Sequence, residues 1–178
     1  MKTTVTEAEE KRYAELQLLA LDAARSGDSL TLASMVRAGL PVNLQDHKGN
    51  TLLMLASYHG HTEIAEALLD CGADPDRRNL RGQTPLGGVA FKGDVEIAAL
   101  LLDAGADPNA DQGSGTTPLM LASLFGRTDM LRLLQQRGAS INARNRWGFS
   151  AGLLGLLFQI ISKIRHPFQS IPPHLLRS

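Results

Sequence analysis

Few residues in this 178-residue sequence have the types and spacing that chemistry at a site requires. His59 and His61 are two positions apart and resemble half of a metal site, but no third ligand follows in register. Cys71 is the single cysteine, and we interpret it as an ordinary surface thiol. The sequence contains no Ser/His/Asp constellation, phosphate-binding loop or zinc-ligand spacing. We therefore expect no catalysis, no cofactor and no bound metal.

Composition limits the class of partner. Hydrophobic residues make up 43% and aromatic residues only 4%, which suits thin layers of small helices better than a sandwich or a barrel. The net charge is zero, so no general attraction for nucleic acid is expected. The distribution is uneven, because residues 1–142 hold 18 acidic and 13 basic side chains, whereas residues 143–178 hold five basic and no acidic ones. This shift marks a candidate boundary at residue 143.

The same features indicate a compartment. A single cysteine cannot form an internal disulfide, which fits a reducing environment. The first residues are rich in Glu and lack the apolar stretch of a signal peptide. The longest apolar stretch, AGLLGLLFQII, is too short to span a membrane and contains Gln159. We expect a cytoplasmic protein.

Three series of glycines recur at intervals of 33 residues, which indicates a repeated structural unit. The series are Gly27, Gly60, Gly93 and Gly126; Gly39, Gly72, Gly105 and Gly138; and Gly49, Gly82, Gly115 and Gly148. A tight turn at glycine followed by Thr or Ser predicts a capped helix, with Pro85 and Pro118 in the first turn. A second helix begins directly after the glycine at its end and carries one apolar face. Each unit is therefore expected to be loop, helix, turn, helix and loop.

The segments GQTPL, GTTPL, LLDCGADPD and LLDAGADPN resemble the ankyrin repeat, particularly in small bacterial proteins. The resemblance implies an all-α solenoid of stacked helix-turn-helix units with projecting loops. It divides the chain into an N-terminal capping helix and partial repeat (1–42), three full repeats (43–142), and the start of a fifth repeat with an atypical tail (143–178).

The sequence departs from the family pattern inside the first helix of each repeat. Met54, Gly87 and Met120 replace the family's histidine, so we expect its hydrogen-bond chain between repeats to be absent. Gly87 and Gly88 stand inside an expected helix and cost roughly 1 kcal/mol each relative to Ala. The second full repeat should therefore be the softest.

The two ends of the chain are expected to be helical. Thr6 should cap a helix that reaches Arg25, buries a stripe of Leu16, Leu19, Ala20 and Ala23, and covers the exposed end of the stack. A Leu/Ile-rich helix is expected from about Ala151 to Ile164, followed by coil that contains proline. This tail could be a hydrophobic cap, a segment that contacts a partner or membrane, or an altered end of the gene product.

In the ankyrin family, partners bind a concave groove formed by the first helices and the loop tips. By register, two residues before each helix-ending glycine should face that groove. They are Arg25 and Ser26, Tyr58 and His59, Phe91 and Lys92, and Leu124 and Phe125. Aromatic residues on a rigid surface are common anchors for proteins, although these rings could instead pack against neighbouring helices.

The loop tips add Lys48, Arg81 and Trp147 to the candidate binding residues. Trp147 and Phe149 could form an exposed hot spot, but burial beneath the tail is the interpretation we favour. Together these residues predict a non-catalytic module that binds another protein, with the cations favouring acidic groups. The alternative is a membrane-peripheral regulator held by the apolar, cationic tail.

Overall fold

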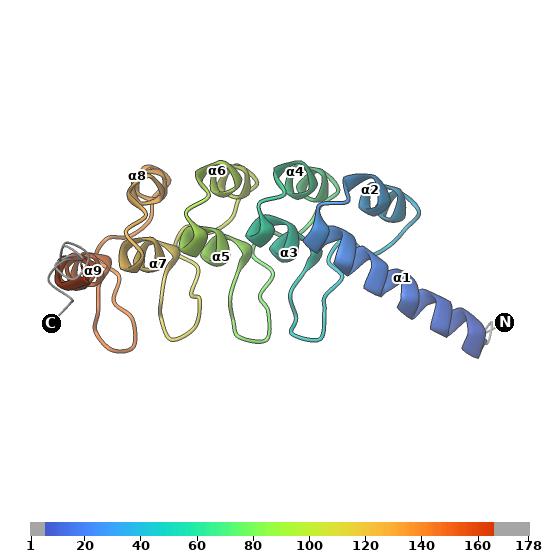
Figure 1. Cartoon of the computed structure of the whole chain (residues 1–178), viewed down its shortest axis with the longest axis horizontal. Helices are drawn as coiled ribbons and strands as arrows, with labels where there is room; N and C mark the ends of the chain where they lie inside the picture. Colours follow the sequence, from blue (N-terminus) through green and yellow to red (C-terminus); the bar gives the residue numbers. More distant parts are fainter. Residues whose placement is uncertain (1–5, 166–178) are drawn as a thin grey trace, which may run out of the picture.

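The computed structural model describes residues 6–165, which form a row of helix pairs with long loops (Figure 1). The helices are α1 (Glu7–Ser26), α2 (Ser29–Arg37), α3 (Leu52–His59), α4 (Thr62–Asp70), α5 (Pro85–Lys92), α6 (Val95–Asp103), α7 (Pro118–Leu124), α8 (Thr128–Gln136) and α9 (Ala151–Arg165). Strand-type pairing in this range is limited to an isolated bridge between Gln45 and Thr51. The predicted all-α architecture of stacked helix pairs is confirmed.

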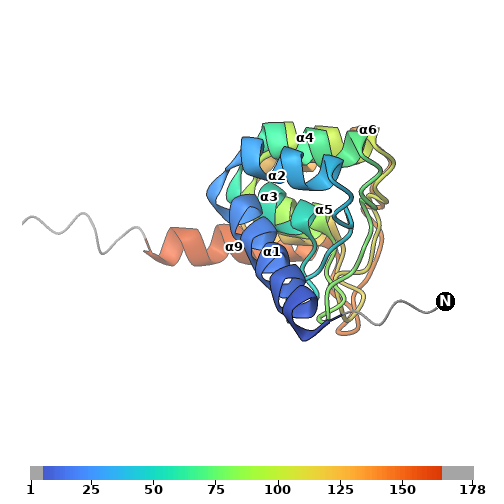
Figure 2. The ribbon, with the colours of Figure 1, turned by 90° about the vertical axis from the view of Figure 1, so that its right-hand side faces the viewer.

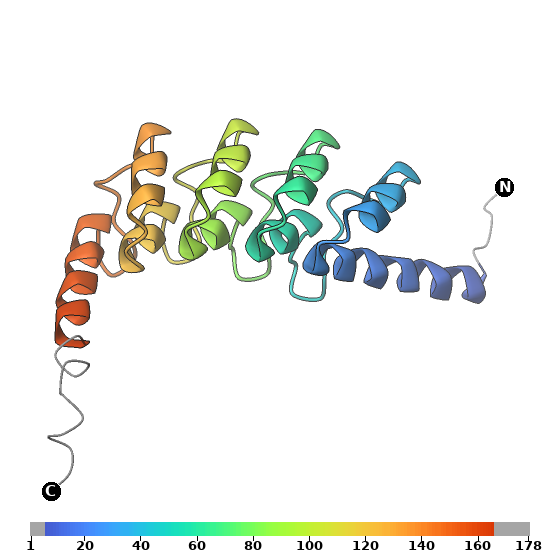
Figure 3. The same ribbon diagram turned by 45° about the horizontal axis from the view of Figure 1, so that its top comes forward.

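The helices form two layers. Helices α3, α5 and α7 make an inner layer, and α2, α4, α6 and α8 lie over it as an outer layer (Figures 1 and 3). The loops leave the inner layer at a steep angle to the helices, so in the end-on view the stacked helices and the stacked loops form two arms of an L (Figure 2). We refer to α3/α4, α5/α6 and α7/α8 as the first, second and third full repeats.

Local signals set the ends of the inner helices as the sequence predicts. The hydroxyls of Thr51, Thr84 and Thr117 accept hydrogen bonds from backbone N–H groups three residues later. Gly60 and Gly93 end their helices with φ angles of 82° and 88°, which residues with a Cβ rarely adopt. The threonine caps and the glycine turns therefore fix where these inner helices begin and end.

The core is built from equivalent positions in successive repeats. Its largest members are Leu, Ile and Met side chains that are almost completely buried between helices. They include Leu53, Leu86 and Leu119 in the inner layer, and Ile64, Ile97, Met130, Leu68, Leu101 and Leu134 in the outer layer. Each repeat thus buries its apolar face against its neighbours, which is the pattern expected of a solenoid.

Polar side chains connect the loops of neighbouring repeats. Asn43 accepts a hydrogen bond from the N–H of Asp74, and Asn109 accepts one from the N–H of Ser140. Asp76 occupies the equivalent position between them and accepts from the N–H of Asp107 at 3.0 Å. Burial, aided by the nearby charges of Asp107 and Asp74, raises the pKa of Asp76 above its ordinary value.

The first loop is joined to the N-terminal helix by an ion pair. Asp46 accepts hydrogen bonds from the N–H groups of Lys48 and Asn50 and from Arg25 of α1, whose guanidinium lies 3.0 Å away. Burial alone would raise the pKa of Asp46, but these bonds outweigh it and lower that pKa. Asp46 therefore stabilises the fold in its ionised form.

The N-terminal helix differs from the expectation. Thr6 caps α1 as predicted, and Ala20 and Ala23 are buried. The prediction that Leu16 and Leu19 are buried is wrong, because both side chains are exposed, by 41% and 51%. The N-terminal part of α1 extends past the stack (Figure 3). The second half of α1 is the inner helix of the partial repeat and packs against α3 and α2 at the N-terminal end of the stack.

The C-terminal helix α9 occupies the position of a fifth inner helix and packs against α7. Ala151 and Leu154 are buried there, and Phe158 lies over the turn at Gly126. The second half of α9 projects beyond the inner layer (Figure 2) and exposes apolar side chains, including Ile160 and Ile161. The part of the tail after Arg165, which contains the expected coil, lies outside the described residues.

Asp46→Asn and Asp76→Asn should change stability in opposite directions at neutral pH. Asp46→Asn loses an ion pair and charged hydrogen bonds, and we expect it to lower the free energy of unfolding by roughly 1 kcal/mol. Asp76→Asn keeps an acceptor but removes a charge that the fold disfavours, so the melting temperature should rise. Both substitutions copy residues of equivalent loops, Asn79 for the first and Asn109 for the second.

The pH dependence of unfolding supplies the check. The stabilisation from Asp46 is present above the ordinary carboxyl pKa of 3.8 and is lost as pH falls through its lowered value. The penalty from Asp76 appears as pH rises through its carboxyl range, so both variants should approach the wild type in acid. Shifts of the same sign for the two variants would contradict these assignments.

Candidate functional site

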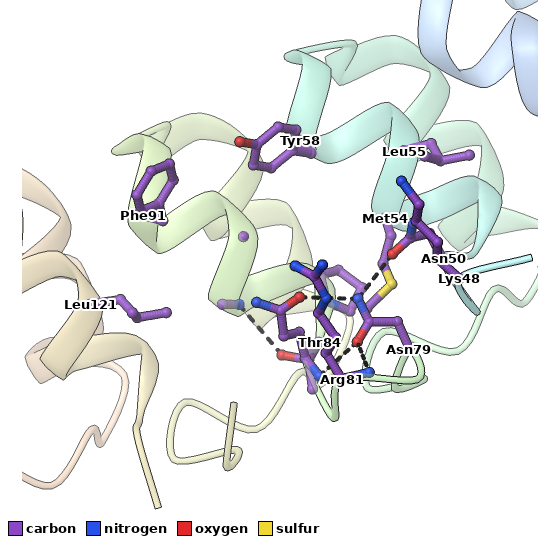
Figure 4. A pocket seen from close by; sticks show the side chains of 14 residues that line it. Lys48, Asn50, Met54, Leu55, Tyr58, Asn79, Arg81, Thr84, Phe91 and Leu121 are labelled. Carbon is purple, nitrogen blue, oxygen red and sulfur yellow. Dashed lines mark hydrogen bonds between the residues drawn. The ribbon is translucent and has the colours of Figure 1, made fainter. Parts of the chain in front are cut away.

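The concave side holds a hollow of about 550 Å³ between the first and second full repeats (Figure 4). Its floor comes from α3 and α5, one wall comes from the loops before those helices, and Leu121 of α7 closes the far side. The lining residues are Lys48, Asn50, Met54, Leu55, Tyr58, Asn79, Arg81, Gln83, Thr84, Pro85, Gly87, Gly88, Phe91 and Leu121. Four predicted binding residues, one cation and one ring from each of two repeats, therefore share one site.

The depth of the hollow follows from one repeat position. Leu55, Gly88 and Leu121 are 33 residues apart and occupy equivalent points of the three inner helices. The two leucines border the hollow, and the missing side chain at Gly88 opens it. A Cβ added to Gly88 would lie 3.3 Å from Cδ2 of Tyr58. Gly88 is thus a gap in an otherwise continuous apolar row.

Gly87 has a different role, because a neighbouring repeat fills its place. The side chain of Gln112 occupies the position that a Cβ on Gly87 would take. Its Oε1 accepts from the Thr84 N–H at 2.8 Å, and its Nε2 donates to Thr84 Oγ1 and the Ala110 carbonyl. Gln112 therefore supplies a side-chain link between repeats at a place where Gly87 stands instead of the family's histidine. That the second full repeat is the softest stays a prediction.

A displaced turn allows Gln112 to reach inward. In the first and second loops, Asp46 and Asn79 accept from the N–H groups two and four residues later. The third loop uses Asp111, one position earlier than the 33-residue spacing requires, to accept from Gly113 and Gly115. The side chain of Gln112 is thereby released from the capping role, although its N–H still donates to the Thr116 carbonyl, and its buried amide links the second and third full repeats.

Aromatic rings line the upper edge of the groove. The rings of Phe91 and Phe125 meet edge to face, with centroids 4.5 Å apart. The ammonium of Lys92 lies 5.0 Å from the centre of the Tyr58 ring, within reach of a cation–π interaction. Tyr58 and Phe125 are exposed by 42% and 38%, whereas Phe91 is half-buried between them. These rings therefore form a supported surface with faces left open.

Two cations from the loops stand beside this apolar surface. Figure 4 shows the Arg81 side chain reaching up from its loop, with Lys48 beside Met54. No carboxylate lines the hollow. In residues 6–165 the ion pairs involve Arg25, Arg132 and Arg137 but neither of these cations. The hollow therefore combines an apolar floor with two cationic side chains that form no ion pair within residues 6–165.

The remaining predicted residues lie elsewhere. His59 does not line the hollow but stacks near His61, with ring centroids 6.3 Å apart. Partial burial, together with the charges of His61, Lys92 and Arg25, lowers the pKa of His59 below its ordinary value of 6.5. Leu124 is half-buried, packs against the core and does not line the hollow, so its place in the groove stays a prediction.

Trp147 lies on the last loop, away from the hollow, and is 63% exposed. Phe149 is also exposed. The favoured interpretation that the tail buries both rings is wrong, because α9 packs against α7 and leaves the loop tip uncovered. Trp147 remains a predicted binding residue at the edge of the groove.

Histidine 61 has a structural role. Its Nε2 lies 2.9 Å from the Arg25 carbonyl, and its ring packs over the Gly27 turn of the preceding repeat. Arg127 makes the equivalent contact with the Phe91 carbonyl at 3.2 Å.

Among the described residues, no three His, Cys, Asp or Glu side chains gather as potential metal ligands. None of the helices between residues 6 and 165 has the length and apolar character needed to cross a membrane.

Several residues that line or support the hollow were missed from the sequence. The Leu55, Gly88 and Leu121 series could have been found, since a glycine between two leucines at one repeat position predicts a gap. Gln112 could not, because its contact depends on a turn shifted by one residue. Loop spacing alone would have placed it at the tip.

Comparison with known families explains the periodicity. A family model described as ankyrin repeats (3 copies) matches residues 20–112 and again 73–145. An ankyrin repeat protein of Pseudomonas aeruginosa is 57% identical over 42 residues, 24% of this chain and 25% of that protein. The human oxysterol-binding protein-related protein 1 is 44% identical over 81 residues, 44% of this chain and 8% of its own.

A third relative is the acyl-CoA-binding domain-containing protein 1 of Arabidopsis thaliana, which is 41% identical over 66 residues. That match covers 36% of this chain and 20% of the relative. The chain therefore spans a quarter or less of the length of each of these proteins. The similarity concerns the repeats.

Ala substitutions at the two adjacent glycines should have opposite effects. Gly88→Ala gains helix propensity and requires the Tyr58 ring to shift by only a few tenths of an ångström, so the free energy of unfolding should rise by up to about 1 kcal/mol. Gly87→Ala should displace Gln112, break its buried hydrogen bonds and lower stability by about 1–3 kcal/mol. Urea denaturation of both variants measures the difference, and equal shifts would refute the distinct roles assigned to them.

Proposed function

The chain belongs to the ankyrin repeat family, and we propose that it is a non-catalytic module that binds another protein through its concave groove and loop tips. The observation that carries the proposal is the hollow between the first and second full repeats. There Tyr58 and Phe91 stand beside Lys48 and Arg81 on rigid, neighbouring elements. Aromatic and cationic side chains on a supported surface are typical anchors of protein interfaces.

The division of labour within each inner helix supports this proposal. Leu53, Leu86 and Leu119 are buried and identical, as stacking requires. The residues toward the end of each helix vary in shape and charge and reach the surface. Variation at exposed positions on a constant framework allows one fold to select a partner.

We assign binding chiefly to residues 43–142, with residues 1–42 and 143–178 as the two ends of the stack. Phe125, Lys92 and Trp147 extend the proposed surface beyond the hollow. The single cysteine agrees with a reducing compartment, and the cytoplasm is the proposed location.

Phe91→Ala tests the proposal. If the ring is an anchor, affinity for the partner should fall by about 2 kcal/mol, a change of about thirtyfold, while loss of the Phe125 contact lowers the free energy of unfolding by a smaller amount, about 1 kcal/mol. The partner is first captured from the producing cells on immobilised full-length chain and then titrated against each variant. Tyr58→Ala should behave similarly.

Arg132→Ala provides a matched control, since this exposed residue lies on the outer helix α8 and pairs only with Asp129. It should leave affinity unchanged. A lower melting temperature with unchanged affinity for Phe91→Ala would show that the rings serve packing, and the groove proposal would then fail.

A further inference from the structure

We propose that the hollow at Gly88 binds a linear acidic segment of the partner that inserts one Leu- or Met-sized side chain and places a carboxylate against Lys48 and Arg81. This inference rests on the proposed function and specifies the chemistry of its partner. It is carried by the shape of the floor and by the charge of the wall, which are independent observations.

The shape of the floor indicates the size of the inserted side chain. In the flanking repeats the position of Gly88 is held by Leu55 and Leu121, so the gap corresponds to one leucine side chain missing from a regular row. Met54 and Phe91 provide further apolar contact around it. A partner side chain of leucine size would complete the row and remove this apolar surface from water.

The floor cannot close the gap by itself. Gln112 holds the start of α5 through Thr84 and fills the space beside Gly87, so the helix cannot move inward. The rings at the rim are also supported, because Phe91 packs on Phe125 and Tyr58 lies beneath Lys92. A preformed gap of this kind favours binding because few side chains of this protein have to lose conformational entropy when the partner binds.

The wall indicates the sign of the partner's charge. The Asn79 side-chain amide donates hydrogen bonds to the side-chain oxygens of Asn50 and Gln83, so these three polar side chains bond to one another. Lys48 and Arg81 are thereby left as the charged donors that line the hollow, and neither side chain forms an ion pair within residues 6–165. A carboxylate is the group that such donors bind most strongly, and Arg81 can bind it with two parallel hydrogen bonds.

The test uses random dodecapeptides displayed on phage and selected on the full-length chain. Enriched peptides are synthesised and titrated by fluorescence polarisation. We expect them to share a Leu or Met next to Asp or Glu. Gly88→Leu, which restores the side chain of the neighbouring repeats, should weaken their binding by about tenfold or more while circular dichroism shows the fold retained.

Charge variants provide the second arm. Lys48→Gln and Arg81→Gln should each weaken binding severalfold and flatten its dependence on salt. Arg77→Gln is the matched control, because Arg77 is exposed in the same region but does not line the hollow. If Gly88→Leu fails to fold, the peptide is changed instead. Replacing its Leu by Ala should remove the apolar contact, replacing its acidic residue by the amide should remove the charge contact, and each change should weaken binding to the wild-type chain.

The outcomes separate this inference from the proposed function. Peptides that lose affinity with Phe91→Ala but tolerate Gly88→Leu would overturn the inference and leave the groove as a binding surface. Enriched peptides without acidic residues, or no enrichment at all, would also overturn it. Insensitivity of the captured partner to every groove variant would refute the proposed function itself.

Discussion

No repeat in this chain can bury its own apolar face, and this constraint shapes the rest of the structure. Two short helices leave one side of each layer uncovered until another repeat stacks on it. Leu53, Leu86 and Leu119 therefore recur with little freedom, and the glycine turns that set the layer spacing recur with them. Positions that point away from the neighbours are released from this requirement and can carry recognition.

The second full repeat shows how far this freedom extends. It lacks side chains at two successive positions of its inner helix, a change that would normally leave a void and a flexible helix. One position is filled by Gln112 from the next repeat, which also satisfies the backbone N–H of Thr84. The other, Gly88, remains open on the concave side. A loss of packing in one repeat is thus compensated by a neighbour, and the surface gains a hollow.

Much of the fold could be predicted from the sequence because local rules determine it. The spacing of Gly60 and Gly93 and the caps at Thr51 and Thr84 fix helix ends without reference to distant residues. The orientation of α1 could not be predicted, because an apolar stripe with Leu16 and Leu19 looks the same whether the stack covers it or not. The repeat spacing correctly predicted that Tyr58 and Phe91 lie near Lys48 and Arg81. It did not predict that the Gln112 side chain points inward, because this depends on the hydrogen bonds that Asp111 accepts from Gly113 and Gly115.

The central claim is that Gln112 from the third repeat holds the second repeat in the shape that keeps the hollow open. Native-state hydrogen exchange of the Thr84 amide in Gln112→Ala tests it most directly. The account predicts that this amide loses its acceptor and exchanges roughly tenfold faster or more, while the Leu55 amide, bonded to the Thr51 carbonyl in the first full repeat, keeps its protection. Unchanged protection at Thr84, or an equal loss at both amides, would contradict it.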